Sequence, residues 1–472
     1  MLKLKNSYLK LPDVFYRMAK PALFSSPKMI AFNQELANEI GLETKERSVE
    51  ELTQFFSGQN NDYNSPTIAL AYAGFQFGHP NPQLGDGRAH LLGESSGFDI
   101  QLKGSGPTPF SRGGDGKSAL GPVLREYIVS EAMYRLGVPT TRALCAIRSG
   151  EEVIRQDGPE PGGIFTRVAE SHIRVGTFQF FSFQGDFASI DTLMNYTIDR
   201  HYPELKELPR DEKAIELLKA LTHKQADLVA RWSALGFIHG VMNTDNFSLA
   251  GITIDYGPCA FMEEFSFEKV FSSIDRNGRY SFFNQVPIAK WNILRLAESL
   301  LPIIHNDQDK AIKIVEKEVV PLFDVFERKR MERLAAKFGI NNYHDGDEKL
   351  VMQFLKYIEK EFLDFTLSFY HLPKLFEGDD SFYKKGESLF RFVHTWKNRV
   401  RDVKGLDSVN PLYIPRNHLI QRAIDRSYQG EDSYFHRLNE ILAEPYTVQV
   451  DAQEFEWPAK PKERVYQTFC GT

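Results

Sequence analysis

The stretch HGVMNTDNFSLAGITIDYG, residues 239–257, constrains the fold more than any other part of the sequence. A long predicted helix leads into it and ends at Gly236, a residue type that commonly terminates helices. Asn246 follows in a loop, and the alternating residues 252–254 predict a short strand that ends at Asp255. An Asp and an Asn that converge at a strand end offer the hard oxygen ligands that Mg²⁺ prefers. The alternative is an ordinary loop followed by a turn, since both pieces are rich in turn-forming residues.

The order of these residues matches the active site of protein kinases. There, a catalytic loop H-R-D-x-x-x-x-N is followed by a strand and the triplet D-F-G. His239 and Asn246 have this spacing, and Asp255 begins the triplet D-Y-G. The position of the kinase base, two residues after the histidine, is Val241, which cannot accept a proton. Asp245 is the nearest free carboxylate that could orient or deprotonate a hydroxyl group.

Two further residues occur in kinase order. Lys103 ends FDIQLKG, a predicted strand in which apolar residues alternate with polar ones. The next predicted helix, over residues 119–136, carries Glu126 at the border of its apolar stripe. Kinases pair a strand lysine with a glutamate on the following helix, beside the nucleotide phosphates. A surface lysine and a solvated glutamate are the alternative.

Two glycine-rich stretches could bind phosphate groups. GDGR, residues 85–88, lies between predicted strands where a kinase carries its glycine-rich loop, but it lacks the full G-x-G-x-x-G pattern. SRGGDGKS, residues 111–118, is not a P-loop, because Ser111 stands where that motif needs glycine. It can still bind an anion through backbone N–H groups, and a flexible turn is the alternative. The candidate residues in the two stretches are Gly85, Gly87, Arg88, Arg112, Asp115, Gly116 and Lys117.

Arg167 and Arg174 are seven residues apart in GGIFTRVAESHIRVGTFQFF. On a helix this spacing is about two turns, so we expect both side chains on one helical face. Two arginines on one face could clamp phosphate oxygens in bidentate fashion. Protein kinases have no such pair here, which indicates an altered nucleotide pose. Ordinary surface arginines are the alternative.

The whole chain predicts a protein of two lobes. Its 472 residues exceed one small domain, and its composition, 42% hydrophobic and 25% charged, is that of an ordinary globular protein. We expect an α+β, protein-kinase-like two-lobed fold with extra helices. An N-terminal extension and a β-rich nucleotide-binding lobe are expected over residues 1–180. A helical lobe with the catalytic loop, the metal site and a C-terminal helical tail is expected over residues 181–472.

Charge and cysteine usage limit the partners and the compartment. The net charge of −6 does not suggest a nucleic-acid binder, and no apolar run approaches the ~20 residues of a membrane-spanning helix. Cys145, Cys259 and Cys470 are too few and too scattered for a disulfide framework or a zinc site, which favours a reducing, cytoplasmic setting.

Residues 1–60 are expected to be ordered and mostly helical rather than a transit peptide, with the helix MIAFNQELANEIG ending at Gly41.

Taken together, the motifs resemble the selenoprotein O family of kinase-like protein adenylyltransferases over nearly the whole chain. The stretches that carry the resemblance are NSYLKLPDVFY, GDGRAHLLGE, DIQLKGSGPTPFSRGGDG, LREYIVSEAMYRLGVPTTRAL, GIFTRVAESHIRVGTF and HGVMNTDNFSLAGITIDYGP. The ending Cys470-Gly471-Thr472 resembles the cysteine-containing bacterial form of the family.

The resemblance implies that ATP binds in an orientation flipped relative to kinases. AMP is then transferred from ATP to Ser, Thr or Tyr hydroxyls of proteins, which could include the enzyme itself, and pyrophosphate is released. The implied cofactors are ATP and Mg²⁺ or Mn²⁺, with Asn246 and Asp255 as metal ligands and Asp245 as the proton acceptor. The implied nucleotide-binding residues are Gly85, Gly87, Arg88, Lys103, Asp115, Gly116, Glu126, Arg167, Arg174 and Asp255.

The sequence leaves two other functions open. An ordinary protein kinase would transfer the γ-phosphate, although Val241 argues against it. A nucleotide-binding pseudokinase scaffold would bind ATP without turnover, although Lys103 and Asp255 argue against a dead site. A redox disulfide between Cys259 and Cys470 is a further hypothesis, and a buried apolar role for Cys259 is favoured over it.

Overall fold

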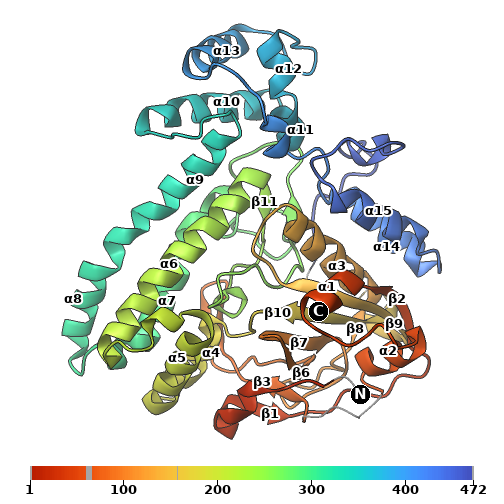
Figure 1. Ribbon diagram of the computed structural model, residues 1–472, viewed down its shortest axis with the longest axis vertical. Coiled ribbons are helices and arrows are strands. Elements are labelled where there is room, and N and C mark those ends of the chain that lie inside the picture. The colour runs from red at the N-terminus through yellow and green to blue at the C-terminus, as the bar shows by residue number, and fades with distance from the viewer. Residues whose placement is uncertain (1–2, 60–65, 157, 470–472) are drawn as a thin grey trace.

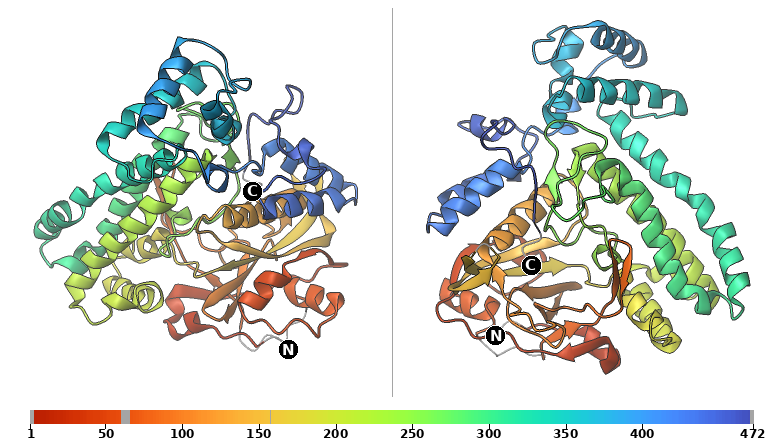
Figure 2. Two further views of the ribbon diagram at one scale, coloured as in Figure 1. Left: turned by 45° about the horizontal axis from the view of Figure 1, so that its top comes forward. Right: turned by 180° about the vertical axis from the view of Figure 1, so that it is seen from behind.

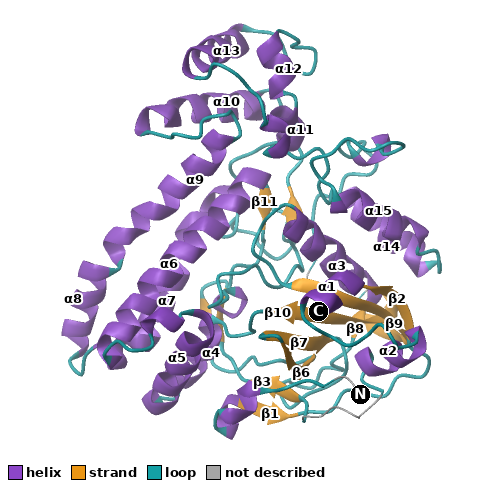
Figure 3. Cartoon of the chain, viewed as in Figure 1, coloured by secondary structure: helices purple, strands orange, loops and turns teal. Residues whose placement is uncertain are grey.

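The computed structural model describes residues 3–59, 66–156 and 158–469 of the chain. It has an α+β architecture, as predicted, with a sheet-rich part and a larger helical part (Figure 1). The strands of the main sheet all lie before residue 170, and helices dominate the chain after that point. Figure 3 shows the strands of the main sheet gathered in the lower part of the molecule, whereas β11 lies apart from them among the helices.

The main sheet contains eight strands within the described residues, and neighbouring strands are antiparallel. Its order is β1 (Tyr16–Met18), β3 (Ile68–Leu70), β6 (Ala89–Ser95), β7 (Phe98–Lys103), β10 (Gly158–Ala169), β9 (Arg142–Arg155) and β2 (Lys28–Phe32), with β8 (Ser118–Ala119) beside β10. Strand β7 has the predicted alternation. Ile100 and Leu102 are fully buried in an apolar cluster, whereas Gln101 and Lys103 bond to groups elsewhere.

Helices cover both faces of this sheet. The short helices α1 (Gln34–Glu39) and α2 (Val49–Phe56) contribute to the apolar cluster under β7. Helix α3 (Leu120–Arg135), predicted from its apolar stripe, packs on β9 and β10. This packing places Glu126 next to the end of β7.

The last two long helices of the chain return to the sheet-rich part. Helices α14 (Asn417–Tyr428) and α15 (Ser433–Ala443) pack on the outer side of α3 (Figure 2). The rings of Tyr127 on α3 and Phe435 on α15 lie 5.5 Å apart. The helical tail therefore supports the helix that carries Glu126.

Helix α6 (Arg210–Leu235) is the longest helix that the structure describes. It ends as predicted at Gly236, whose φ of +67° is the left-handed conformation that glycine adopts at low cost. It packs on α7 (Gln285–Ile304) and α9 (Asp324–Ala336), so the segment after Gly236 starts from a fixed position.

The remaining elements complete the helical part. The helices are α4 (Val175–Ser182), α5 (Phe187–His201), α8 (Gln308–Glu318), α10 (Glu348–Lys360), α11 (Phe365–Tyr370), α12 (Leu372–Glu377) and α13 (Glu387–Arg399). The strands β11 (Phe237–Ile238) and β12 (Ala260–Phe261) form a small pair, and β4 (Gly74–Gln76) and β5 (His79–Asn81) form a separate hairpin.

The prediction for residues 1–60 was partly wrong. The described part of this region contains strands β1 and β2 as well as helices. The predicted helix MIAFNQELANEIG begins as β2, because residues 28–32 pair with β9, and only Gln34–Glu39 is α-helical. Gly41 follows the helix with a φ of +70°, close to the predicted end.

The predicted strand at residues 252–254 is absent from the secondary structure. Thr253 makes a single bridge to Thr140, and its backbone N–H donates to the carbonyl of Pro139. Ile252 and Ile254 are nevertheless buried, and Ile252 clusters with Ala169 at the end of β10 and with Ala250.

Candidate functional site

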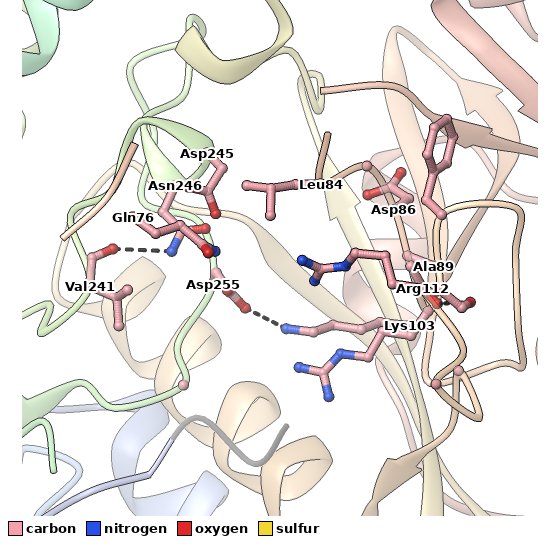
Figure 4. Close-up of a pocket in the computed structure, with 18 of the residues that line it drawn as sticks. Gln76, Leu84, Asp86, Ala89, Lys103, Arg112, Val241, Asp245, Asn246 and Asp255 are labelled. Carbon is pink, nitrogen blue, oxygen red and sulfur yellow. Dashed lines mark hydrogen bonds and ion pairs between the residues drawn. The ribbon is translucent and has the colours of Figure 1, made fainter. Parts of the chain in front are cut away.

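A cleft of about 880 Å³ lies between the sheet and the segment 239–257 (Figure 4). It brings together residues that are far apart in the sequence. The predicted site residues that line it are Gly85, Gly87, Arg88, Lys103, Asp115, Gly116, Arg167, Arg174, Asp245, Asn246 and Asp255. Glu126 is not part of the lining and contacts the site through Lys103 and Arg167.

Lys103 joins three parts of the fold at the floor of the cleft. Its Nζ lies 2.6 Å from Oε2 of Glu126 on α3 and 2.5 Å from Oδ1 of Asp255. The predicted ion pair between Lys103 and Glu126 is therefore present. Because the Glu126 side chain is almost fully buried, this pair is far less screened by water than a surface pair.

Arg167 and Arg174 do not share a helix, so that prediction was wrong. Arg167 lies in β10, directly opposite Gln101 in β7, and Arg174 precedes helix α4. The apolar run 158–169 pairs with strands on both sides, so side chains alternate with a period of two instead of 3.6. Both arginines nevertheless line the cleft, with exposed fractions of 2% and 4%.

Arg167 is held by one carboxylate and one neutral amide. Its Nη1 donates to Oε1 of Glu126 at 3.2 Å, and its Nη2 donates to Oε1 of Gln101 at 2.7 Å. Its Nε is buried without a hydrogen-bond partner in the described part of the chain. A buried guanidinium with an unused donor is a binding group for an anion.

Within the described ranges, Arg174 has no carboxylate partner closer than 3.9 Å. Its Nη1 donates to the backbone carbonyl of Asp245 at 2.8 Å, and its guanidinium lies 4.6 Å from the ring centre of Tyr72. The nearest carboxylate oxygen is Oδ1 of Asp86, at 3.9 Å from Nη2. Its positive charge is therefore only partly balanced.

The sequence analysis missed Asp86, which lies between the two glycines of GDGR. It is 3% exposed, and its Oδ2 accepts hydrogen bonds from Nε2 of Gln101 at 2.9 Å and from the N–H of Leu70 at 3.2 Å. Burial raises the pKa of Asp86, although the nearby Arg174 and Arg167 oppose this shift. Its position between two glycines is the sequence feature that could have identified Asp86 as a site residue.

Asp245 is a buried carboxylate at the opposite wall. It is 8% exposed, and its Oδ1 has no hydrogen-bond partner among the described residues. A side chain at Gly74 would place its Cβ 2.5 Å from this Oδ1, so only glycine fits beside it. Burial raises the pKa of Asp245 to about 6, against the opposing charge of Arg174. This value is in the range where a carboxylate can accept a proton near neutral pH.

Asp255 has the opposite electrostatic environment. Burial alone would raise its pKa, but the positive charges of Lys103 and Arg167 outweigh this and hold the pKa of Asp255 far below its usual range. Its backbone has a φ of +72°, a conformation that is uncommon outside glycine and often found at functional sites. The carboxylate therefore stays ionised and fixed in the cleft.

Asn246 and Asp255 fit the role of metal ligands. The amide Nδ2 of Asn246 donates to the carbonyl of Val241 at 3.1 Å, which leaves Oδ1 available. Together with the ionised carboxylate of Asp255, this amide oxygen is a hard donor of the kind that Mg²⁺ binds. Across the described residues, no group of three or more His, Cys, Asp or Glu side chains could hold a metal by itself. Such a site depends on oxygen atoms of a bound substrate.

Val241 lines the cleft at the position of the kinase base and is 6% exposed. The loop after it is fixed by the β4–β5 hairpin. The N–H of Phe75 donates to Oγ1 of Thr244 at 2.7 Å, and the N–H of Phe77 donates to Oδ1 of Asn243 at 3.0 Å. No local pattern in the chain predicts this contact, which holds Asp245 under the hairpin.

The two glycine-rich stretches pack against each other at the mouth of the cleft. Gly85 has a φ of +68°, and a Cβ there would lie 2.3 Å from the ring of Phe110. Gly116 has a φ of +64°, and its Cβ would lie 2.2 Å from the backbone of Gly106. Both glycines are thus required by close packing, and Arg112 lines the cleft between them.

Asp115 is partly exposed and is anchored by a residue that the sequence analysis missed. Nη1 of Arg155, at the end of β9, donates to its Oδ2 at 2.9 Å, and the N–H of Lys117 donates to its Oδ1 at 3.0 Å. Lys117 itself pairs with Glu151 at 2.5 Å. Arg155 and Lys117 at this rim are therefore both paired with carboxylates, and these pairs hold the turn in place.

Cys145 and Cys259 are buried free thiols, as expected for apolar core positions. Cys470 lies outside the described residues, so the hypothesis of a disulfide with Cys259 stays untested. Within the described ranges, no helix has the length and apolar character needed to cross a membrane.

Comparison with known proteins gives one consistent result. A family model described as protein adenylyltransferase SelO matches residues 1–443. The chain is 46% identical over 488 residues to a protein nucleotidyltransferase YdiU of Rhizobium etli, covering 99% of this chain and 97% of that protein. It is 44% identical over 481 residues to the protein of the same name from Syntrophotalea carbinolica, covering 99% and 97%. With that from Agrobacterium fabrum it is 44% identical over 493 residues, covering 100% of both. The chain therefore belongs to the SelO family of protein nucleotidyltransferases.

Proposed function

We propose that this protein is an adenylyltransferase that moves AMP from ATP to Ser, Thr or Tyr hydroxyls of proteins, including its own. In this proposal the fold is protein-kinase-like, with a nucleotide-binding lobe over residues 1–180 and a helical lobe over residues 181–472. ATP lies in the cleft with its α-phosphate toward the acceptor hydroxyl, reversed relative to kinases. Family membership and the distribution of charge in the cleft support this function.

The proposal rests on a contrast between two positions of one segment, Val241 at the position of the kinase base and Asp245 four residues later. The position of the kinase base is an apolar side chain, so the normal γ-phosphate route lacks its proton acceptor. Four residues later, Asp245 presents a buried, unpartnered carboxylate oxygen with a pKa raised by burial to about 6. This is the group in the segment that can accept the proton of a hydroxyl near neutral pH.

The proposed reaction forms one bond to the α-phosphorus and breaks another. The acceptor oxygen forms a bond to the α-phosphorus while its proton passes to Asp245. The bond between the α-phosphorus and the bridging oxygen of the β-phosphate breaks, and pyrophosphate leaves. Arg167 and Arg174 hold the outer phosphates, and their place in the cleft lining supports this role. Arg88, Lys103, Asp115 and the turns at Gly85, Gly87 and Gly116 complete the nucleotide site, with Glu126 orienting Lys103 and Arg167.

A divalent cation, Mg²⁺ or Mn²⁺, would be held by Asn246 and Asp255 together with phosphate oxygens. When bound, such an ion neutralises charge on the phosphates of the substrate. Asp255 supports this assignment because it stays ionised in the cleft, and Asn246 because its oxygen is left unused by the bond to Val241. We place the reaction in the cytoplasm, on the basis of the two buried free thiols.

Labelled ATP tests this proposal directly. We expect protein to become labelled when the enzyme is incubated with Mg²⁺ or Mn²⁺ and ATP that carries the label at the α-phosphorus. Label from the γ-phosphorus should not be transferred. Transfer of γ-label alone would identify an ordinary kinase instead. Absence of transfer from either position, together with a thermal shift on adding ATP, would identify a nucleotide-binding scaffold.

A further inference from the structure

A chain of buried side chains lies behind the arginine wall of the cleft. Gln101, on β7, donates from Nε2 to Oδ2 of Asp86 at 2.9 Å and accepts at Oε1 from Nη2 of Arg167 at 2.7 Å. It is fully buried and does not line the cleft. Its two hydrogen bonds fix its amide orientation, because the neighbour on one side is an acceptor and the neighbour on the other side is a donor.

We propose that Gln101 is a positioning residue that holds Arg167 toward the outer phosphates of the nucleotide without cancelling its charge. The inference rests on the proposed function only for the identity of those phosphates. Gln101 touches no bound ligand in this arrangement and acts through Arg167. It therefore contributes to ATP binding from behind the cleft wall.

The charges around Arg167 explain why a neutral partner matters here. The only carboxylate that contacts Arg167 among the described residues is that of Glu126, at 3.2 Å, and Glu126 also contacts Lys103 at the shorter distance of 2.6 Å. Glu126 is thus shared between two cations, of which Lys103 has a second carboxylate partner in Asp255 and Arg167 contacts no other carboxylate in the described ranges. Because the second bond of Arg167 goes to an amide, the guanidinium keeps a net attraction for an anion in the cleft.

The strand register makes Gln101 the residue that can do this. Gln101 and Arg167 are directly opposite each other in the pairing of β7 with β10. Two residues later on the same face of β7, Lys103 contacts Glu126 and Asp255. One face of one strand therefore fixes Arg167 and supplies Lys103, so a change at Gln101 acts on the phosphate site locally.

Two substitutions separate the bond from the charge. Gln101→Leu removes both hydrogen bonds and adds no charge. Gln101→Glu keeps the shape but adds a negative charge next to Arg167 and against Asp86. Asn410→Leu is the matched control, because Asn410 is also a buried amide, 1% exposed, and donates to the carbonyl of Lys337 at 2.9 Å, far from the cleft lining.

Calorimetry should measure the binding of pyrophosphate, ATP and adenosine to each full-length variant, alongside its melting temperature. We expect both Gln101 variants to bind pyrophosphate and ATP roughly tenfold to a hundredfold more weakly, since a hydrogen bond to a charged group is lost or its charge is neutralised. Adenosine binding should stay within about twofold of the original, because the nucleoside carries no phosphate for the arginine to hold. Asn410→Leu should lower the melting temperature without changing pyrophosphate binding.

Several results would overturn this inference. One is unchanged pyrophosphate binding in either Gln101 variant. Another is an equal loss of affinity for adenosine and for pyrophosphate. A third is failure of both variants to fold, which would make the role of Gln101 structural. Failure of the original protein to bind pyrophosphate would also contradict it. The proposed function can fail independently of this inference. If the protein transfers only γ-label while its Gln101 variants still lose pyrophosphate binding, the proposed adenylyltransferase activity is refuted and the role of Gln101 stands.

Discussion

Asp245→Asn should remove most of the transfer activity and, at neutral pH, stabilise the fold. The carboxylate is 8% exposed, and burial raises its pKa to about 6, against the opposing charge of Arg174. The difference from the ordinary value of 3.8, at 1.36 kcal/mol per pKa unit, corresponds to about 3 kcal/mol of unfolding free energy. Asparagine has nearly the same shape and no charge to bury, so the variant avoids this cost.

The sign of the effect follows from proton binding. The folded protein holds the Asp245 proton more tightly than the unfolded chain does, so deprotonation opposes folding. The cost is small below pH 3.8, grows as the pH rises from 3.8 to about 6, and is complete above that value. The unfolding free energy of Asp245→Asn should therefore exceed that of the original protein by about 3 kcal/mol at pH 7 and by little at pH 4.

The transfer rate should show the same ionisation with the opposite consequence. A general base works only when deprotonated, so with a pKa of about 6 roughly a tenth of the Asp245 carboxylates are active at pH 5. The value of kcat/KM for ATP, which reports the ionisation of the free enzyme, should then fall about tenfold between pH 7 and pH 5. In Asp245→Asn the rate should be lower by about 10²- to 10⁴-fold and should lose this pH dependence.

The assays are initial rates with α-labelled ATP across pH 5–8 and urea unfolding at pH 4 and pH 7. Asp425→Asn serves as the control, because Asp425 is exposed on α14 and its Oδ1 accepts from Gln421, a bond that an amide oxygen can keep. It should change neither readout. A flat pH profile in the original protein, or the same pH dependence in Asp245→Asn, would refute the assignment of Asp245 as the base.

Two other substitutions test the geometry around the cleft. Glu126→Gln removes a buried charge that balances Lys103. We therefore expect α-label transfer to fall by roughly tenfold to a hundredfold and the unfolding free energy to fall by about 1–3 kcal/mol. An unchanged transfer rate would contradict the role of the Lys103–Glu126 pair. Gly74→Ala would place a Cβ 2.5 Å from Oδ1 of Asp245, so transfer should be lost while ATP still binds. Gly386→Ala is its control, since a Cβ there meets no atom within 4 Å, and equal activity of the two variants would show that the contact is unimportant.

The parts of the site that follow from local pattern could be predicted from the sequence. The alternation of FDIQLKG places Lys103 on the polar side of a strand, and the stripe of the next helix fixes the face that carries Glu126. Gly236 marks the end of the long helix, so the start of the catalytic segment was also predictable. Each of these inferences needs only the period of one element and the order of elements along the chain.

The parts that depend on strand pairing could not be predicted in this way. Arg167 and Arg174 have a spacing that suits one face of a helix. The apolar residues around Arg167 are compatible with either a helix or a strand. Pairing of β10 with strands on both sides decides between helix and strand, and it places Arg167 opposite Gln101 in β7 and Ala143 in β9. Gln101 was missed for the same reason, because its importance comes from the register that places it opposite Arg167.

The raised pKa of Asp245 shows why such a site needs the tertiary structure. A carboxylate four residues after Val241 would be solvated in an isolated loop and would ionise as an ordinary aspartate. The β4–β5 hairpin changes this, because Gly74 packs directly against Oδ1 of Asp245, and two backbone N–H groups of the hairpin bind side chains of the same loop. Burial by a segment some 170 residues earlier in the chain thus raises the pKa of Asp245 into the range that its proposed role as base requires. The stability lost in burying it and the reactivity gained have the same physical origin, so a substitution that relieves the first must also remove the second.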